Sequence, residues 1–171
     1  MLANPNSILE SFDLDILDLS EIGTIFAEHT KNGDLVLLSG KVGAGKTEFA
    51  RQIIKAKAIK ENLDIEEISS PTFSLIQTYD FQYCKISHID LYRVNSEEEL
   101  FELGIPDIFD GQITLLEWPE ILEIKNFSRN VSFEIKETKE TRVIKIEFFG
   151  NGWGDLILSL LESGHFNHEK I

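Results

Sequence analysis

Cysteine is nearly absent from the sequence: Cys84 is the single cysteine among 171 residues. One thiol excludes an internal disulfide and suits the reducing environment of the cytoplasm. Cys84 lies in an apolar strand pattern, which favours a buried structural thiol over a reactive one. The chain also lacks any apolar run near the ~20 residues that a membrane-spanning helix needs. Residues 1–13 lack the basic and apolar segments of an export signal. We expect a cytoplasmic protein with no role for a membrane.

Basic residues are scarce as well. The chain has 16 Lys and Arg against 30 Asp and Glu, for a net charge of −14, and no run of it is rich in Lys or Arg. An acidic chain repels the phosphates of nucleic acids unless it carries a separate basic patch. Tight direct binding to RNA or DNA is therefore not expected, and a protein partner fits this charge better.

The pattern of apolar residues predicts an α/β fold in one domain over residues 1–171, with a mixed central sheet, helices on both of its faces and two antiparallel hairpins. We expect a loose arm at residues 1–11 and a frayed tail at residues 167–171. The predicted strands cover residues 12–16, 35–38, 65–70, 74–81, 84–92, 113–117, 131–137 and 142–149. The predicted helices run from a cap at Asp18 or Ser20 to about residue 33, from 47 to about 62, from 96 to about 104, and from 152 to 166.

The most informative stretch is a phosphate-loop motif. Its pattern, G-x-x-x-x-G-K-[ST], is filled by Gly40, Gly45, Lys46 and Thr47. A continuous apolar run, as a strand buried on both faces requires, precedes the motif, and a segment with helical spacing follows it. Strand, glycine loop and helix in this order predict a P-loop nucleoside-triphosphatase rather than a glycine turn that only links two elements.

The chemistry of the motif follows from its backbone. Glycines allow several N–H groups to point inward as an anion nest, and the first N–H groups of the following helix face the same point. Lys46 would reach the β- and γ-phosphates, and the hydroxyl of Thr47 would bind Mg²⁺. We predict nucleotide contacts from the loop and helix start, namely Val42, Gly43, Ala44, Gly45, Lys46, Thr47 and Glu48. Arg142 begins a later strand and is a candidate for a phosphate or ribose contact, with a surface arginine as the default.

Two acidic residues at the ends of predicted strands are candidates for the metal. His88, Asp90 and Tyr92 alternate with apolar residues and so share one face of a strand. Asp90 is a candidate because Mg²⁺ prefers carboxylate oxygen; the alternative is a solvated strand face. Glu117 ends a buried apolar strand, as the acid of a Walker B segment does, where it would bind Mg²⁺ or orient the attacking water.

A polar loop containing Ser70, Pro71 and Thr72 follows the first strand–helix unit. A nucleotide sensor and a plain connector fit this loop equally well.

Absent motifs indicate which nucleoside triphosphate the chain uses. The chain has neither the [NT]-K-x-D motif nor the D-x-x-G motif of GTPases, so ATP is favoured over GTP. A small-molecule kinase is an alternative, disfavoured because arginine occurs only at positions 51, 93, 129 and 142 and forms no cluster. A nucleotide-gated assembly module with negligible activity of its own is another.

From about residue 20 to residue 166 the chain resembles the TsaE family, also called YjeE. Five motifs occur in that family's order: Ser-Gly-Lys-Val-Gly-Ala-Gly-Lys-Thr (39–47), Ser-Pro-Thr-Phe-Ser-Leu (70–75), His-Ile-Asp-Leu-Tyr-Arg (88–93), Glu-Leu-Gly-Ile (102–105) and Glu-Trp-Pro-Glu (117–120). The resemblance implies a small P-loop ATPase that binds ATP and Mg²⁺. It implies a role in forming N6-threonylcarbamoyladenosine (t6A) at position 37 of tRNAs that read ANN codons.

The resemblance also implies partners and residue roles. The chain would act with the TsaB–TsaD pair, reach tRNA only through that complex, and hydrolyse ATP weakly without the pair. Thr47, Asp90 and Glu117 would surround Mg²⁺ and the γ-phosphate, and Thr72 would be the sensor, so the implied catalytic residues are Lys46, Thr72, Asp90 and Glu117. One departure stands out: the family often has a second hydroxyl residue where this chain has Glu48, which puts the α-phosphate contact in doubt.

Overall fold

The computed structural model describes residues 7–65, 67–105, 109, 111–122, 129–138 and 141–168. Within these residues one 8-stranded sheet forms, in the order β3-β4-β5-β2-β6-β7-β1-β8. Its strands are β1 (Ser7–Ser11), β2 (Leu35–Ser39), β3 (Ile76–Asp80), β4 (Lys85–Asp90), β5 (Ile113–Glu117), β6 (Arg129–Glu137), β7 (Arg142–Gly150) and β8 (Phe166–His168). The helices are α1 (Ile16–His29), α2 (Lys46–Lys60), α3 (Glu97–Glu102) and α5 (Gly154–Glu162), with a short 3-10 turn, η1 (Pro119–Ile121).

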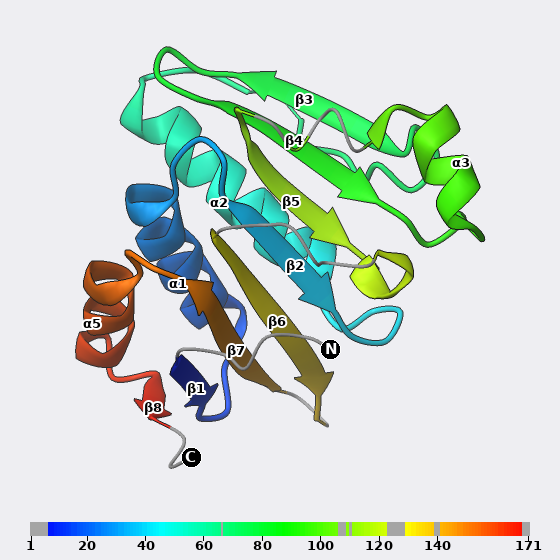
Figure 1. Cartoon of the computed structure of the whole chain (residues 1–171). Coiled ribbons are helices and arrows are strands. Elements are labelled where there is room, and N and C mark those ends of the chain that lie inside the picture. The colour runs from blue at the N-terminus through cyan, green and yellow to red at the C-terminus, as the bar shows by residue number, and fades with distance from the viewer. Residues whose placement is uncertain are drawn as a thin grey trace.

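The sheet is mixed, as the sequence predicts. The four central strands β4, β5, β2 and β6 run parallel, while β3 pairs with β4 and β7 pairs with β6 in antiparallel hairpins. Figure 1 shows α1, α2 and α5 lying along one side of the sheet. None of the helices in the described ranges combines the length and apolar character that crossing a bilayer requires.

Alternation along β2 explains why helices cover both faces. Val36 and Leu38 join a core with α1, α2 and α5, whereas Leu35 and Leu37 join a second core with Leu100 of α3. Successive side chains of a strand point to opposite faces, so a strand of continuous apolar residues must be buried on both. The first core contains three packed rings, Phe26, Phe49 and Phe133, with centroids 4.7–5.8 Å apart.

Both chain ends differ from the prediction within the described residues. Ser7–Ser11 is not a loose arm but strand β1, which pairs with β7 and β8. Phe166–His168 forms β8, so the first two residues of the expected frayed tail are ordered as a strand. These short strands are held by backbone hydrogen bonds, which the pattern of side chains in the sequence does not reveal. Within β1, Leu9 and Ser11 are buried. The rest of each predicted end lies outside the described residues.

The start of α1 also differs from the prediction. The strand expected over residues 12–16 is absent, and the helix begins at Ile16, capped by Asp15 rather than by Asp18 or Ser20. Asp15 Oδ1 accepts hydrogen bonds from the backbone N–H groups of Leu17 (2.7 Å) and Asp18 (3.0 Å), while Asp18 Oδ2 accepts from the Asp15 N–H (2.7 Å). This reciprocal capping box satisfies amides that the helix itself leaves unpaired.

The strand expected over residues 65–70 is likewise wrong for the described residues of that range. The Ile68 carbonyl instead accepts a hydrogen bond from Arg51 Nε at 2.8 Å. The segment therefore runs beside α2 and leads into the loop with Ser70 and Thr72.

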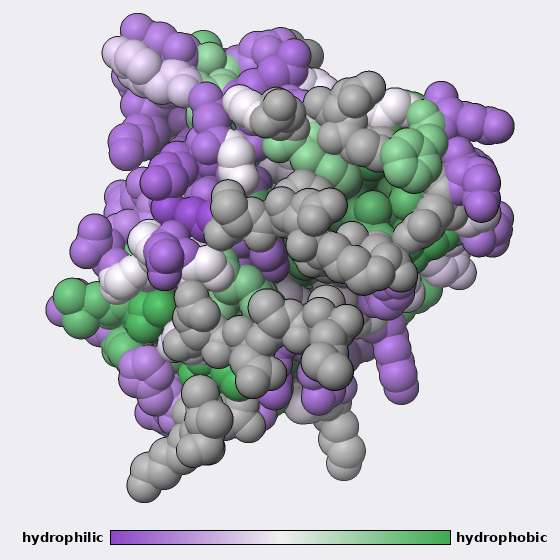
Figure 2. All heavy atoms as spheres, viewed as in Figure 1, coloured by the Kyte–Doolittle hydropathy of each residue, from purple (hydrophilic) through white to green (hydrophobic). Residues whose placement is uncertain are grey.

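The chain is acidic, with a net charge of −14. Figure 2 shows that apolar side chains on the viewed face gather near α3 and over α5. Phe101 of α3 is 70% exposed and Leu158 of α5 is 56% exposed.

Candidate nucleotide-binding site

The glycine loop joins the end of β2 to the start of α2, at the edge of the sheet where the parallel strands end. Three of its glycines have positive φ: Gly40 (140°), Gly43 (85°) and Gly45 (109°). At Gly40 a Cβ would lie 2.5 Å from the Ile135 carbonyl oxygen. A side chain cannot fit there, so Gly40 lets the loop run close against β6.

The start of α2 is open. Gly45 is the N-cap and supplies no side-chain hydrogen bond to the first N–H groups of the helix. Such unpaired amides, together with the positive end of the helix dipole, favour an anion. Arg142, the first residue of β7, contacts the loop: its Nε donates a hydrogen bond to the Ala44 carbonyl at 3.0 Å. That contact braces the loop and keeps a cationic side chain beside it.

Lys46 is buried and lies across the loop. Its Nζ donates to the carbonyl oxygens of Gly40 (2.7 Å) and Lys41 (2.9 Å) and lies 3.8 Å from the ring centroid of Trp118. Burial lowers the pKa of Lys46, while the carboxylates of Glu117, Asp90 and Glu120 act in the opposite direction. The ammonium is thus held by neutral acceptors that a phosphate can replace.

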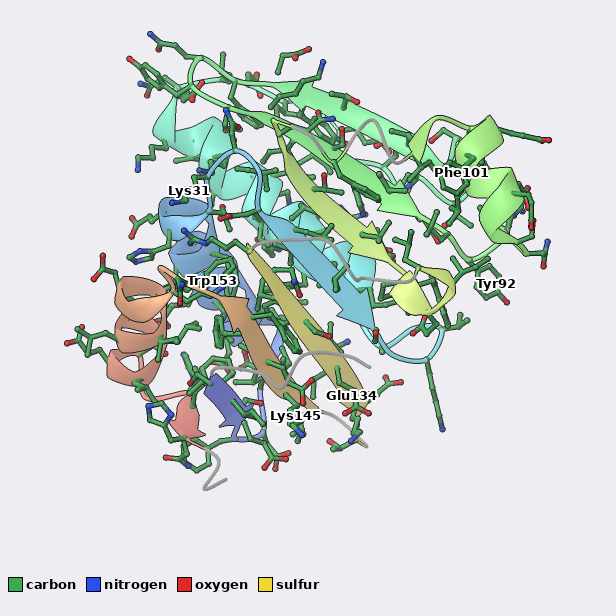
Figure 3. All side chains as sticks on the ribbon, viewed as in Figure 1. Lys31, Tyr92, Phe101, Glu134, Lys145 and Trp153 are labelled. Carbon is green, nitrogen blue, oxygen red and sulfur yellow. The ribbon has the colours of Figure 1, made fainter. Side chains whose placement is uncertain are left out.

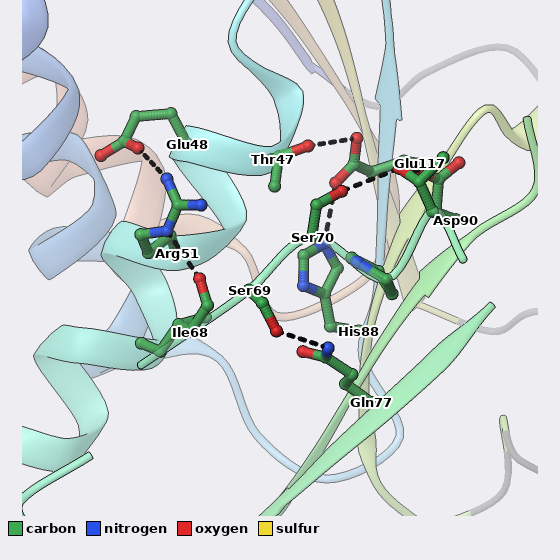
Figure 4. Close-up of polar contacts among 12 residues, drawn as sticks. Thr47, Glu48, Arg51, Ile68, Ser69, Ser70, Gln77, His88, Asp90 and Glu117 are labelled. Atoms are coloured by element: carbon green, nitrogen blue, oxygen red, sulfur yellow. Dashed lines mark hydrogen bonds and ion pairs between the residues drawn. The ribbon is translucent and has the colours of Figure 1, made fainter. Parts of the chain in front are cut away.

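Glu117 connects the loop to the sheet. Its Oε2 accepts a hydrogen bond from Thr47 Oγ1 at 3.0 Å, and its Oε1 lies 2.8 Å from His88 Nε2 (Figure 4). Glu117 and His88 are almost completely buried. Asp90 is the parallel neighbour of Glu117 in the register of β4 and β5. The two acids that sequence reasoning selected at separate strand ends therefore lie side by side.

Asp90 connects the sheet to the polar loop at residues 70–72. Thr72 Oγ1 donates a hydrogen bond to Asp90 Oδ2 at 2.6 Å, and the hydroxyls of Ser70 and Thr72 are 2.8 Å apart. The other carboxylate oxygen, Oδ1, accepts from the backbone N–H of Tyr92 at 2.9 Å. The loop that the sequence left open as sensor or connector thus contacts a candidate metal ligand.

Glu48 does not point toward the loop amides. Its carboxylate contacts Arg51 Nη1 (Figure 4). It also accepts a hydrogen bond from Gln52 Nε2 at 2.5 Å, and both partners lie one turn further along α2. The backbone of Glu48 stays at the helix start, but its side chain is directed away from it.

A cleft of about 1020 Å³ opens beside the loop. Residues 39–42 of the loop, Tyr92, Trp118, and residues 134–138 from the end of β6 line it. Tyr92 and Glu134, labelled in Figure 3, mark two of its sides. Trp118 adopts φ 59° and ψ 57°, a conformation that residues other than glycine rarely take, and its ring centroid is 5.0 Å from that of Tyr92. Lys41 from the loop and these two rings therefore belong to the lining of the cleft.

Two residues that contact the candidate site residues, His88 and Arg51, were not predicted as site residues from the sequence. His88 shares a strand face with Asp90, which was noted, but its contact with Glu117 depends on the pairing of β4 with β5. Arg51 has only its helical spacing from Glu48 as a signal. The remaining candidates, Val42, Gly43, Ala44 and Gly45, belong to the loop itself, and Val42 is 71% exposed.

The donor atoms fit a magnesium ion held jointly with phosphate. Nowhere in the described part of the chain do three or more His, Cys, Asp or Glu side chains form a metal site of their own. The site instead offers the hydroxyl of Thr47 and the carboxylates of Asp90 and Glu117. Mg²⁺ commonly takes one or two carboxylates and completes its shell with substrate phosphates and water.

Comparison with known proteins gives matches over most of the chain. The family model "Threonylcarbamoyl adenosine biosynthesis protein TsaE" matches residues 15–144. A tRNA threonylcarbamoyladenosine biosynthesis protein TsaE from Rickettsia typhi is 44% identical over 99 residues, 58% of this chain and 66% of that protein. The chain thus spans just under two thirds of the length of that relative. The Rickettsia bellii protein of the same description is 41% identical over 122 residues, 71% of this chain and 79% of that protein.

A solved structure shares the fold. The crystal structure of Bacillus subtilis YdiB aligns with a TM-score of 0.66 at 23% identity and covers 92% of this chain and 97% of that one. The likeness concerns the arrangement of helices and strands, and it agrees with the α/β fold described above.

Proposed function

The chain belongs to the TsaE family, and from this premise we propose that it is a Mg²⁺-dependent ATPase that acts with TsaB and TsaD in the t6A modification of tRNA. One observation carries the proposal: the hydroxyl of the loop residue Thr47 is hydrogen-bonded to Glu117, the acid at the end of β5, at 3.0 Å. This contact joins the glycine loop, where we propose that phosphate binds, to the carboxylate to which we assign the catalytic role. In this proposal residues 1–171 act as one ATPase domain.

Phosphate binding rests on the loop and Lys46. The open amides at the start of α2 accept negative charge, and the Lys46 ammonium exchanges its two carbonyl acceptors for phosphate oxygens. Phosphate oxygens carry negative charge, so they attract the ammonium more strongly than neutral carbonyl oxygens do, and the exchange favours the bound state. Arg142 supports the loop through its hydrogen bond to the Ala44 carbonyl, and in this proposal it stays a candidate for a phosphate or ribose contact.

Thr47, Asp90 and Glu117 would hold Mg²⁺ together with the β- and γ-phosphates. Bound there, the ion would neutralise charge on the phosphate oxygens. Glu117 keeps a fixed orientation because Thr47 contacts one of its carboxylate oxygens and His88 contacts the other. In this proposal Glu117 orients the attacking water. Thr72 holds Asp90 by donating to Oδ2, so a movement of the loop at residues 70–72 would alter the position of Asp90.

The nucleotide in this proposal is ATP, since the chain carries no guanine-recognition motif. The net charge of −14 supports contact with tRNA through protein partners rather than directly. The proposed location is the cytoplasm, where tRNA modification requires no membrane.

Phosphate release separates this function from the alternatives. The protein is incubated with ATP and Mg²⁺ alone, with candidate hydroxyl metabolites, and with the TsaB–TsaD pair. Release of inorganic phosphate that rises on addition of the pair supports the proposal, and Glu117→Gln serves as the matched inactive control. Transfer of the phosphate to a metabolite would identify a kinase instead. Binding of ATP with no release under any condition would leave only a nucleotide-gated assembly role.

A further inference from the structure

The position of Glu48 poses a problem for anion binding. Glu48 is the third residue of α2, and Gly45 is the N-cap. A glutamate at this position ordinarily folds back onto the N-cap amide and is attracted by the positive end of the helix dipole. Such a conformation would put a carboxylate among the amides that face the proposed phosphate site. It would compete for those amides and repel the phosphates.

The carboxylate is held elsewhere by two side chains of the same helix. Arg51 Nη1 contacts Oε2 as an ion pair, and Gln52 Nε2 donates to Oε1 at 2.5 Å. Both oxygens are therefore engaged one turn along the helix. The side chains of Glu48 and Arg51 are 27% and 28% exposed, so the pair is only partly open to solvent. No side chain caps the helix at Gly45, and its amides stay open.

Neighbouring segments fix the two side chains that restrain Glu48. Arg51 Nε donates to the Ile68 carbonyl at 2.8 Å, which sets the direction of the guanidinium. Gln52 packs against α1 at Gly23, where an added Cβ would lie 2.6 Å from the Gln52 Cβ. Because Arg51 has a second, independent partner, it can hold Glu48 in one orientation instead of following it.

We propose that Arg51 is a positioning residue for nucleotide binding, which keeps the Glu48 carboxylate away from the phosphate loop with the help of Gln52. The inference rests on the proposed binding of ATP at this loop. Without the guanidinium, Glu48 is free to turn toward the loop amides and compete with the phosphate chain. Arg51 acts only through Glu48, so its importance depends on the charge at position 48.

A double-mutant cycle tests that dependence. ATP affinity is measured by calorimetry for the full chain, Arg51→Met, Glu48→Gln and the double variant, with Mg²⁺ present throughout. We expect Arg51→Met to weaken binding about tenfold, the size of one charge-assisted hydrogen bond. Glu48→Gln should bind as well as the unmodified chain or better. The double variant should recover most of the loss, since no carboxylate remains to be restrained.

Three controls isolate the effect. Lys55→Met removes the same charge from an exposed position of α2 and should leave affinity unchanged. Arg51→Lys keeps a charge that can pair with Glu48 but cannot also donate to the Ile68 carbonyl, so its affinity should lie between those of Arg51→Met and the unmodified chain. If Arg51→Met does not fold, Arg51→Lys with and without Glu48→Gln provides the same test. Inorganic tripolyphosphate, which has no base or ribose, should show the same pattern of affinities as ATP because the competition is for phosphate.

The outcomes distinguish this inference from the proposed function. If the unmodified chain binds ATP and Arg51→Met binds equally well, Arg51 has no positioning role. If Arg51→Met lowers ATP affinity by the same factor in the unmodified chain and in the Glu48→Gln variant, Arg51 acts independently of Glu48 and the inference is wrong. If the unmodified chain does not bind ATP or tripolyphosphate, the proposed function itself fails.

Discussion

Replacing Lys46 with alanine should remove most of the affinity for ATP. In the free protein the ammonium donates two hydrogen bonds, to the carbonyl oxygens of Gly40 (2.7 Å) and Lys41 (2.9 Å). In the proposed complex both are exchanged for phosphate oxygens. We take the net gain as about one hydrogen bond to a charged group, about 1.5–3 kcal/mol. Its loss corresponds to about a 10- to 150-fold rise in Kd.

Calorimetric titration with ATP and Mg²⁺ measures this loss, and thermal melting of Lys46→Ala checks that the variant is folded. Lys55→Ala is the matched control: Lys55 is an exposed lysine of α2 that does not line the cleft, and the affinity of this variant for ATP should change by less than about threefold. Equal affinity for Lys46→Ala and the unmodified chain would refute the assignment of the loop lysine. Equal losses in both variants would mean that general charge, rather than the position of Lys46, attracts the nucleotide.

Three further predictions concern turnover, the loop backbone and acid stability. Glu117→Gln should bind ATP normally but lower turnover with the partner pair about 10²- to 10⁴-fold; normal phosphate release would remove Glu117 from the mechanism. Gly40→Ala should lose affinity and melt lower, because its φ of 140° and the Ile135 oxygen leave no room for a Cβ; an unchanged Kd would contradict this. Hydrogen bonds from the backbone of Asp18 and Leu17 lower the pKa of Asp15 from 3.8. Its contribution to stability is present above pH about 4 and is lost as the pH falls through the lowered pKa, so Asp15→Ala should melt lower at neutral pH and approach the unmodified chain in acid.

The sequence alone predicts the parts of the site that depend on local pattern. Strand, loop and helix around Gly40–Thr47 follow from a contiguous motif, and the structure has these elements in that order. Asp90 and Glu117 are recognisable singly as acids at strand ends. Their adjacency follows from the parallel pairing of β4 with β5, which joins residues far apart in the chain.

Features that depend on tertiary pairing were missed. Strand β1 is held by backbone hydrogen bonds to β7 and β8, which periodicity does not reveal. His88 alternates with apolar residues as a solvated strand face would, yet it is buried against Glu117. The N-cap of α1 is Asp15 and not Asp18, because Asp18 is the reciprocal partner in the capping box.

The most direct test of the account is a crystal structure of the chain with Mg²⁺ and an ATP analogue that cannot be hydrolysed. The account predicts that the triphosphate lies along the amides of residues 42–48, with Lys46 Nζ on its terminal oxygens. It also predicts that Thr47, Asp90 and Glu117 surround the ion. A nucleotide bound elsewhere, or a terminal phosphate remote from both carboxylates, would contradict it.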